Sequence, residues 1–260
     1  MKKNSAKISV IMNCHNGEKY LKQSLRSILN QSYKNWELIF FDNKSNDKSI
    51  SIIKKFKDNR IKIHRSKIFL NLYSARNHAI QKATGQYIAF LDTDDLWKKN
   101  FIKEHIKAFE NDKSRDVVFS KYNIYNQRKK VLKINFEKSF SSKDLTQQLF
   151  DNYFIGILAI MLKKKIFKNY KFNSNFNIIG DFDLFILLSL KYNFYGISKP
   201  LSIYRIHENN YSSKKVKTYI KEFQTWIKKN KRKYKKFDLF KIKYFLFKLR
   251  IKYLLNFIIN

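Results

Sequence analysis

Strand-like and helix-like patterns alternate along the first ninety residues, and this alternation restricts the fold more than any other feature. Mostly apolar runs, typical of buried strands, occupy residues 8–12, 36–41, 61–63 and 87–91. Apolar residues at helical spacing fill the segments between these runs. Because strands that alternate with helices favour parallel pairing, we expect an α/β fold with a mostly parallel central sheet and helices on both faces.

The later part of the chain contains further elements and changes in character near residue 212. We expect a helix that ends near Phe109, a strand at 117–120, a polar hairpin within 122–142, a helix at 182–191 and a strand at 201–205. Residues 213–260 hold sixteen Lys and Arg but only two acidic residues, Glu222 and Asp238. We therefore predict one domain over residues 1–212, followed by a basic, amphipathic, helical extension over 213–260.

The high net charge is weaker evidence for the class of protein than its size suggests. The net charge of +35 would suit a nucleic acid or an anionic membrane as partner. However, Lys, Asn, Ile, Phe and Tyr are abundant while Gly and Pro are scarce, a bias typical of AT-rich coding sequences. The single cysteine, Cys14, excludes an internal disulfide, and the longest apolar stretch falls far short of the ~20 residues that span a bilayer. We predict a cytoplasmic protein, or one attached to the membrane surface.

Three carboxylates, Asp92, Asp94 and Asp95, follow directly after the apolar run at 87–91. In open α/β sheets, ligands bind just beyond the carboxyl ends of the strands. Crowded carboxylates repel one another unless a cation lies among them, and hard divalent cations prefer oxygen ligands. Asp92 and Asp94 project to the same side of an extended chain. A solvated turn is the ordinary alternative, but three acidic residues in four positions of a basic protein favour a metal site.

Short motifs occur in a characteristic order between residues 8 and 212. They are Ile-Ser-Val-Ile-Met-Asn-Cys-His-Asn-Gly-Glu-Lys-Tyr-Leu at 8–21, Ser-Ile-Leu-Asn-Gln-Ser-Tyr at 27–33, Asp-Asn-Lys-Ser-Asn-Asp at 42–47, Ala-Arg-Asn at 75–77, Thr-Gly-Gln-Tyr-Ile-Ala-Phe-Leu-Asp-Thr-Asp-Asp-Leu-Trp at 84–97, Gly-Asp-Phe-Asp-Leu at 180–184 and Tyr-Arg-Ile-His at 204–207. In order and spacing they resemble glycosyltransferase family 2, the bacterial nucleotide-sugar glycosyltransferases with the GT-A fold.

This resemblance implies a metal-dependent, inverting transfer of a sugar from a nucleotide-sugar donor, with UDP as the expected nucleotide. It assigns a Mg²⁺ or Mn²⁺ ion to Asp94, and His207 is a further candidate ligand. A polar loop histidine without a metal is the alternative for His207. The candidate donor-binding residues are Asn13, His15, Asn16, Asp42, Arg76 and Asp92. Among them, Asp92 would bind the ribose and Asp42 the uracil, while Arg76 would reach the base or the diphosphate unless it is an exposed helix arginine.

The resemblance also implies a catalytic base, Asp181, which would take the proton of the acceptor hydroxyl. Asp183 is the rival candidate, and a helix cap is the structural alternative for Asp181. The chain departs from the family pattern at Gly180, where the family has a Glu, and at Asn43 and Lys44, where it has an Asp and a Gly. We expect donor binding within about 1–110, an acceptor region within about 111–212, and a cell-surface glycan or lipid-linked acceptor.

Other classes of protein compete with this interpretation. A nucleotidyltransferase would need a Gly-rich basic loop after the first strand, where Gly17 stands alone. A basic nucleic-acid-binding protein would suit the charge but not the clustered carboxylates. A family member that binds without turnover is the third alternative. In the extension, we expect 214–230 to dock on the domain and 237–260, rich in aromatic residues and lysines, to contact an anionic membrane surface.

Overall fold

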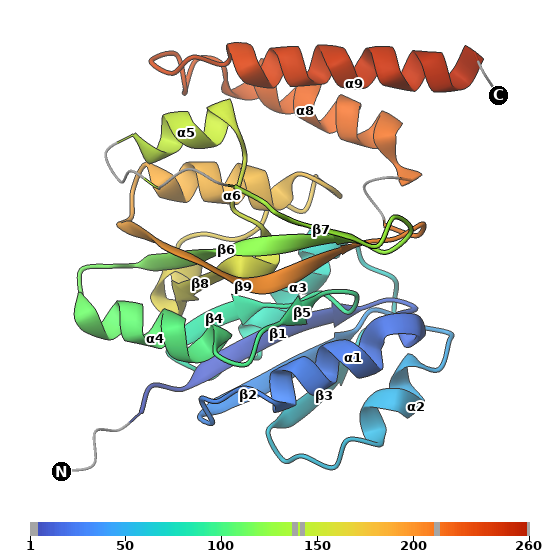
Figure 1. Ribbon diagram of the computed structural model, residues 1–260, viewed down its shortest axis with the longest axis vertical. Helices are drawn as coiled ribbons and strands as arrows, with labels where there is room; N and C mark the ends of the chain where they lie inside the picture. Colours follow the sequence, from blue (N-terminus) through green and yellow to red (C-terminus); the bar gives the residue numbers. More distant parts are fainter. Residues whose placement is uncertain (1–4, 137–139, 141–143, 211–213, 259–260) are drawn as a thin grey trace.

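A mixed sheet runs through the centre of the molecule, and its first half is parallel (Figure 1). A computed structural model describes residues 5–136, 140, 144–210 and 214–258. The parallel half has the strand order β3-β2-β1-β4. Its strands are β1 (Ile8–Cys14), β2 (Trp36–Asp42), β3 (Ile61–Arg65) and β4 (Tyr87–Phe90). The sequence-based prediction of these four strands is confirmed.

The second half of the sheet mixes directions because β8 runs antiparallel to both of its neighbours, β4 and β6. Next to β6 lies β9, which is parallel to β6 and longer than the strand expected at 201–205. The expected hairpin is confirmed, since β7 pairs antiparallel with the end of β6. The strands of this half are β5 (Leu96–Trp97), β6 (Val117–Asn126), β7 (Val131–Ile134), β8 (Ile160–Lys163) and β9 (Phe194–Ile206).

Helices cover both faces of the sheet, as predicted. Along β1, Val10 and Met12 belong to one apolar core and Ile11 to the other, because successive side chains of a strand point to opposite faces. The core of Val10 and Met12 includes α1 (Glu18–Leu29), α2 (Ser49–Lys54) and α4 (Phe101–Asn111). The core of Ile11 includes α3 (Leu72–Gln81), α5 (Leu145–Asp151) and α6 (Gly180–Ser189). Two short 3₁₀ helices, η1 (Ile157–Ala159) and η2 (Lys164–Lys168), flank β8.

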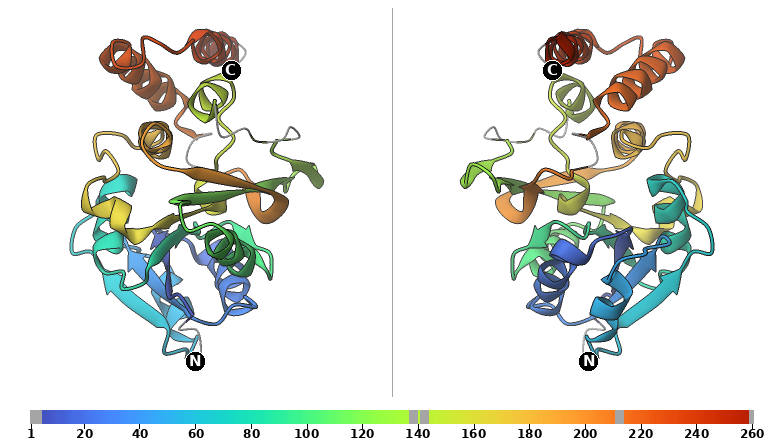
Figure 2. Two further views of the ribbon diagram at one scale, coloured as in Figure 1. Left: turned by 90° about the vertical axis from the view of Figure 1, so that its left-hand side faces the viewer. Right: turned by 90° about the vertical axis from the view of Figure 1, so that its right-hand side faces the viewer.

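The basic C-terminal part forms two helices, α8 (Val216–Asn230) and α9 (Phe240–Ile258). Figures 1 and 2 show them as an outer layer over α5 and α6. The side chains of Phe223 and Trp226 on α8, and of Ile242 and Leu246 on α9, are buried in the core that contains α6. The expected docking of 214–230 is confirmed. Within the described ranges, no helix is both long and apolar enough to cross a membrane.

Candidate functional site

The parallel strands bring the predicted site residues to one edge of the sheet. Cys14 at the end of β1 is in register with Asp42 at the end of β2, and β4 ends two residues before Asp92. Polar side chains that follow each of these strands therefore gather at one place. This is the position at which open α/β sheets bind their ligands.

The first pair at this edge is Asp94 and His207. The Nε2 atom of His207 lies 3.0 Å from Oδ2 of Asp94, although 113 positions separate the two residues in the chain. His207 follows β9, and its ring packs against that of Tyr20 on α1 at 4.7 Å. The side chain of His207 is 8% exposed and that of Asp94 is 29% exposed, so the carboxylate remains open to a ligand.

The donor set of this pair suits a divalent cation that also binds a diphosphate. A neutral imidazole nitrogen and a carboxylate oxygen are both metal ligands, and Mg²⁺ sites often combine one or two protein ligands with substrate phosphates. No third His, Cys, Asp or Glu joins them among the residues that the structure describes. As placed, His207 Nδ1 accepts a hydrogen bond from the Asn209 backbone N–H at 3.1 Å, so Nε2–H donates to Asp94. Metal binding at Nε2 would move the ring hydrogen to Nδ1 and break the Asn209 contact.

Asp92 does not share this site, because Arg76 holds it. Nη2 of Arg76 lies 2.7 and 2.8 Å from the two carboxylate oxygens of Asp92. Arg76 is only 2% exposed, so the alternative of an exposed helix arginine is wrong. Burial would lower the pKa of Arg76, but the Asp92 carboxylate more than compensates and keeps the guanidinium charged. The predicted ribose ligand is thus oriented by a buried, charged partner.

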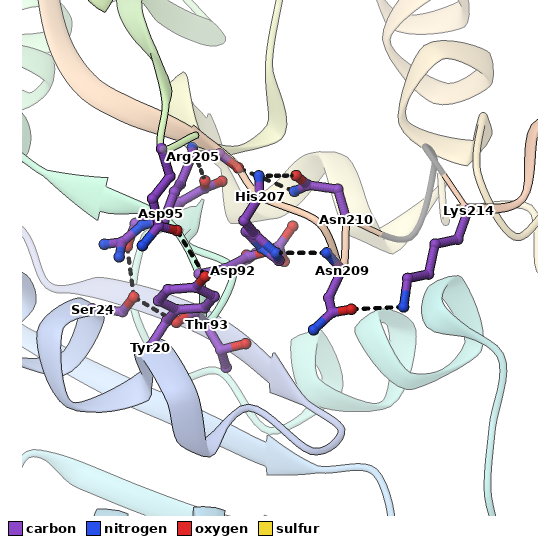
Figure 3. Close-up of polar contacts among 12 residues, drawn as sticks. Tyr20, Ser24, Asp92, Thr93, Asp95, Arg205, His207, Asn209, Asn210 and Lys214 are labelled. Carbon is purple, nitrogen blue, oxygen red and sulfur yellow. Dashed lines mark hydrogen bonds and ion pairs between the residues drawn. The ribbon is translucent and has the colours of Figure 1, made fainter. Parts of the chain in front are cut away.

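Asp95 supports the loop that carries Asp92 and Asp94. Asp95 is 2% exposed, and its carboxylate accepts a hydrogen bond from the Arg205 backbone N–H at 2.9 Å. The Ser24 hydroxyl contacts the backbone carbonyls of Thr93 and Asp95 at 2.7 and 2.6 Å. Figure 3 shows these contacts between the loop, α1 and the end of β9. The loop is therefore held from two sides, which fixes the direction of the neighbouring carboxylates.

The candidate donor-binding residues in and after β1 and β2 differ in whether their side chains already have polar partners in the protein. Both polar side-chain atoms of Asn13 are buried without a hydrogen-bond partner in the described part of the chain, an arrangement that suits a bound ligand. Asp42 is fully buried and lies 3.3 Å from Nε of Arg65, so a base could reach it only after the exposed Arg65 moves. Asn16 accepts a hydrogen bond from Asn46 N–H at 2.9 Å, which ties its side chain to the adjoining loop.

His15 lies beside an aromatic residue that the sequence-based reasoning missed. Its ring is exposed and makes an edge contact with Phe69, with centroids 4.7 Å apart, and Phe69 is 59% exposed. Asn43, a departure from the family pattern, binds the backbone of Leu70 through both ends of its amide. The loop with Phe69 is thereby fixed next to the ends of β1 and β2. An aromatic residue in the loop after a parallel strand was the available sequence signal.

Asp181 lies on α6, on the other side of the Arg76–Asp92 pair. Its Oδ1 atom is 3.1 Å from the hydroxyl of Tyr73, and the Arg76 guanidinium lies over the ring of that tyrosine, 5.4 Å from its centre. Burial raises the pKa of the Asp181 carboxyl above its ordinary value, and the charge of Arg76 only partly offsets this. A raised pKa makes a carboxylate a stronger base. Asp181 lies within the first turn of α6 and does not cap it, since the helix begins at Gly180.

The rival base, Asp183, has a structural partner. Its Oδ1 accepts a hydrogen bond from the indole N–H of Trp226 on α8 at 2.7 Å. Glu222, also on α8, accepts hydrogen bonds from the backbone N–H groups of residues 177, 178 and 179 at 2.6, 2.9 and 3.2 Å. Glu222 is buried, and these groups directly precede α6. Helix α8 therefore positions the start of α6, and the first turn of α6 carries Asp181.

A steric constraint explains why the residue before Asp181 is a glycine. A Cβ atom at Gly180 would lie 2.6 Å from two carbons of the Tyr73 ring, closer than such atoms approach in proteins. Tyr73 is 1% exposed and also donates a hydrogen bond to the Ile178 carbonyl at 2.6 Å. Tyr73 thus fills the space that a side chain at position 180 would need. The departure from the family pattern at Gly180 is accommodated locally and leaves Asp181 in contact with a hydroxyl.

Comparisons with known proteins find relatives that are glycosyltransferases by name. The chain is 33% identical over 220 residues to the uncharacterized glycosyltransferase MJ1057 of Methanocaldococcus jannaschii, covering 82% of this chain and 76% of the relative. It is 29% identical over 212 residues to the Escherichia coli UDP-Glc:alpha-D-GlcNAc-diphosphoundecaprenol beta-1,3-glucosyltransferase WfgD, covering 81% of each.

Solved structures share the fold. S. aureus TarS 1-349 in complex with UDP-GlcNAc superposes with a TM-score of 0.67 at 20% identity, over 85% of this chain and 66% of TarS 1-349. The mannosyltransferase PcManGT from Pyrobaculum calidifontis, solved with GDP-Man and Mn²⁺, gives a TM-score of 0.64 at 14% identity, over 87% and 65%. The chain spans slightly less than two thirds of both solved chains. The sequence model named Glycosyl transferase family 2 matches residues 9–177, well over half of the chain. The protein belongs to glycosyltransferase family 2.

Proposed function

We propose that the protein transfers a sugar from a UDP-linked donor to a hydroxyl group, with inversion at the anomeric carbon and with a divalent cation held by Asp94 and His207. The observation that carries this proposal is the 3.0 Å approach of His207 to Asp94 beside the Arg76–Asp92 pair. When bound there, a Mg²⁺ or Mn²⁺ ion would neutralise the charge that develops on the departing diphosphate. TarS, solved with UDP and with UDP-GlcNAc, is consistent with a UDP donor.

The residues divide the work of the reaction between them. Asp92, oriented by Arg76, binds the donor ribose, while Asn13, His15 and the exposed ring of Phe69 surround the base. The acceptor oxygen attacks the anomeric carbon, and its proton passes to Asp181. The bond from that carbon to the diphosphate oxygen breaks, and its electron pair leaves with UDP. A single displacement of this kind inverts the anomeric configuration. Donor binding thus falls within about residues 1–110 and the acceptor side beyond them.

The acceptor that we propose is a cell-surface glycan or a lipid-linked sugar. Two relatives support this class of acceptor. WfgD is named for a diphosphoundecaprenol-linked acceptor, and Bacillus subtilis TuaG, 30% identical over 227 residues, for putative teichuronic acid biosynthesis. A lipid-linked acceptor lies at a membrane, and helix α9 has an exposed apolar face that suits contact with a membrane surface.

One face of α9 is exposed and aromatic. Its residues Phe240, Tyr244, Phe247 and Ile251 follow helical spacing, and they are 66%, 47%, 58% and 42% exposed. At 100° per residue, lysines and an arginine flank this stripe on both sides, namely Lys241 and Lys248 on one and Lys243 and Arg250 on the other. We propose that this stripe, residues 240, 244, 247 and 251, lies against an anionic membrane surface on the cytoplasmic side.

The first test of the function is donor binding followed by turnover. We expect UDP with Mn²⁺ to raise the melting temperature, and UDP with EDTA or an oligonucleotide to leave it unchanged. A screen of nucleotide sugars for UDP release then identifies the donor. Stabilisation by the oligonucleotide alone would favour the nucleic-acid alternative. Stabilisation by UDP with Mn²⁺ but no release from any sugar nucleotide in the presence of lipid-linked acceptors would favour a member that binds without turnover.

A further inference from the structure

A cavity of about 410 Å³ lies between α5, α6, α8 and α9, and Asp181 forms part of its wall. Its size falls within the range of about 300–1,000 Å³ that small-molecule sites occupy. Asp181 as a residue is half-buried, and it is one of the residues that line the cavity. The proposed base therefore lines this cavity and is linked to the Arg76–Asp92 pair through Tyr73.

The walls of the cavity are mostly apolar and aromatic. Phe182 of α6, Tyr219 of α8, and Ile242 and Phe245 of α9 line it. Tyr153, after α5, also lines it, and its hydroxyl is buried without a hydrogen-bond partner among the described residues. A buried hydroxyl without a partner is costly unless a ligand satisfies it. The walls therefore suit a ligand that is largely apolar but carries hydroxyl groups.

The outer part of the cavity changes in chemistry toward α9. Lys241 lines it and is 58% exposed, with its Nζ 3.1 Å from Oδ2 of Asp151. Phe245 lines it too, and 44% of its surface is exposed. From Asp181 outward, the cavity thus presents a base, aromatic walls, an ammonium group and an exposed apolar helix. The residues of α8 and α9 that build it lie beyond the region matched by the family.

We propose that this cavity is the acceptor subsite and that its ligand is a sugar carried on a hydrocarbon chain through a phosphate. The sugar hydroxyl would reach Asp181, the aromatic walls would pack against the C–H faces of the sugar, and the phosphate would meet Lys241. The hydrocarbon would leave past Phe245 along α9. This proposal rests on the proposed function in one respect, the role of Asp181. It assigns to α8 and α9 the selection of the acceptor.

The direct test is binding of a short isoprenoid phosphate. Farnesyl diphosphate is titrated calorimetrically into the full chain in EDTA, so that no metal can bridge its phosphates at the donor site. Asn152→Trp places an indole at the cavity, since Asn152 lines it and is exposed. Asn111→Trp is the matched control, because Asn111 is an exposed asparagine at the end of α4. We expect farnesyl diphosphate to bind the wild type and Asn111→Trp alike, and Asn152→Trp at least tenfold more weakly.

Further arms separate the alternatives. Inorganic pyrophosphate should not bind at the same concentrations, and dihexanoylphosphatidylglycerol should not displace farnesyl diphosphate. Equal affinity of all three proteins for farnesyl diphosphate overturns the proposal. So does equal binding of pyrophosphate, which would show anion binding alone, or displacement by the short phospholipid, which would show a site for membrane lipid.

Two controls protect the interpretation. Phe245→Asp, which brings a charge to a half-exposed position of the apolar wall, should weaken binding at least tenfold and serves if Asn152→Trp does not fold. Stabilisation by UDP with Mn²⁺ should persist in the cavity variants. If UDP fails to stabilise even the wild type, the proposed donor chemistry fails while the farnesyl diphosphate result stands. If UDP binds and farnesyl diphosphate does not, only the acceptor subsite fails.

Discussion

Nε2 of His207 lies 3.0 Å from Oδ2 of Asp94, so the loop after β9 meets the loop after β4. The Tyr20 ring packs against the His207 ring, and the guanidinium of Arg205 lies 4.5 Å from the centre of the Tyr20 ring. The histidine is therefore held by its packing against the tilted Tyr20 ring as well as by its hydrogen bonds. This pairing supports a cation site with two protein ligands, in which the oxygens of a bound diphosphate would supply further ligands.

Replacing Asp94 with Ala should abolish metal-dependent UDP binding and leave the fold intact, because the change removes one charge from a group of neighbouring carboxylates. At a UDP concentration of about 100 times Kd, the wild type should gain about 2.7 kcal/mol of stability. Thermal melts with and without Mn²⁺ measure this gain. Glu208→Ala is the matched control, since Glu208 is an exposed acid beside His207. An undiminished gain for Asp94→Ala would refute the assignment.

Asp181→Asn should lower kcat by at least ~10²-fold while UDP affinity changes little, because an amide cannot take the proton of the acceptor. Asp183→Asn should stay near normal, since an amide oxygen can still accept the Trp226 hydrogen bond. Steady-state kinetics with UDP titrations compare the two. Normal turnover of Asp181→Asn together with an inactive Asp183→Asn would reverse the roles.

The pH dependence of the reaction follows from the same carboxyl group. Burial raises the pKa of Asp181 above its ordinary value of 3.8, and a carboxyl group in the proposed role of base accepts a proton only when it is deprotonated. The rate should therefore fall with decreasing pH at a midpoint above 3.8. The same shift costs stability above the pH at which Asp181 ionises, so Asp181→Asn should melt higher than the wild type at neutral pH. That difference should vanish below the unfolded-state pKa.

The sequence contained enough local signal to predict the strands, the loop of Asp92 and Asp94, and the family. Each of these depends on residues that are close in the chain, such as an apolar run that ends at carboxylates. Buried pairings were beyond reach because they join distant segments. The bond from Arg76 to Asp92 joins a helix to a loop, and nothing in the local pattern distinguishes Arg76 from an exposed arginine.

Gly180 is a second case in which the local sequence does not reveal a contact with a distant segment. In the sequence, this glycine looks like the loss of a catalytic neighbour. In the structure, the ring of Tyr73, more than a hundred positions earlier, occupies the space beside it. Helix α5 was also missed, because it has only seven residues and packs through a few apolar positions. Short elements that depend on tertiary packing carry little periodic signal.

Glu222→Gln should weaken the start of α6, because the amide offers one acceptor oxygen to three backbone N–H groups. Groups left unpaired in a buried place cost about 1–3 kcal/mol. We expect a lower melting temperature. At temperatures where the variant is folded, we expect a larger loss in kcat than in UDP affinity, since α6 carries Asp181. Lys221→Gln is the control, because Lys221 is the exposed neighbour on α8. An unchanged ratio of kcat to UDP affinity in a folded variant would limit Glu222 to stability.

The exposed stripe of α9 should direct the protein to anionic membranes. A buried Phe side chain contributes about 1.5–3 kcal/mol, and a lysine near an anionic leaflet about 1 kcal/mol. Replacing both Phe240 and Phe247 with Ser should therefore weaken partitioning at least tenfold on phosphatidylglycerol vesicles. The matched control replaces Ile68 and Leu132 with Ser, since these are 63% and 57% exposed but lie outside α9.

Co-sedimentation at two salt concentrations makes the comparison decisive. Binding of the wild type should be stronger to phosphatidylglycerol than to phosphatidylcholine and should fall as salt rises, because salt screens exposed charges. The two double variants should then separate, with the Ile68 and Leu132 variant near wild type. Equal partitioning of both double variants would remove the stripe as the contact surface. A wild type that shows no preference for the anionic lipid would exclude the electrostatic part, and α9 would then act only through the residues that it packs against α5 and α8.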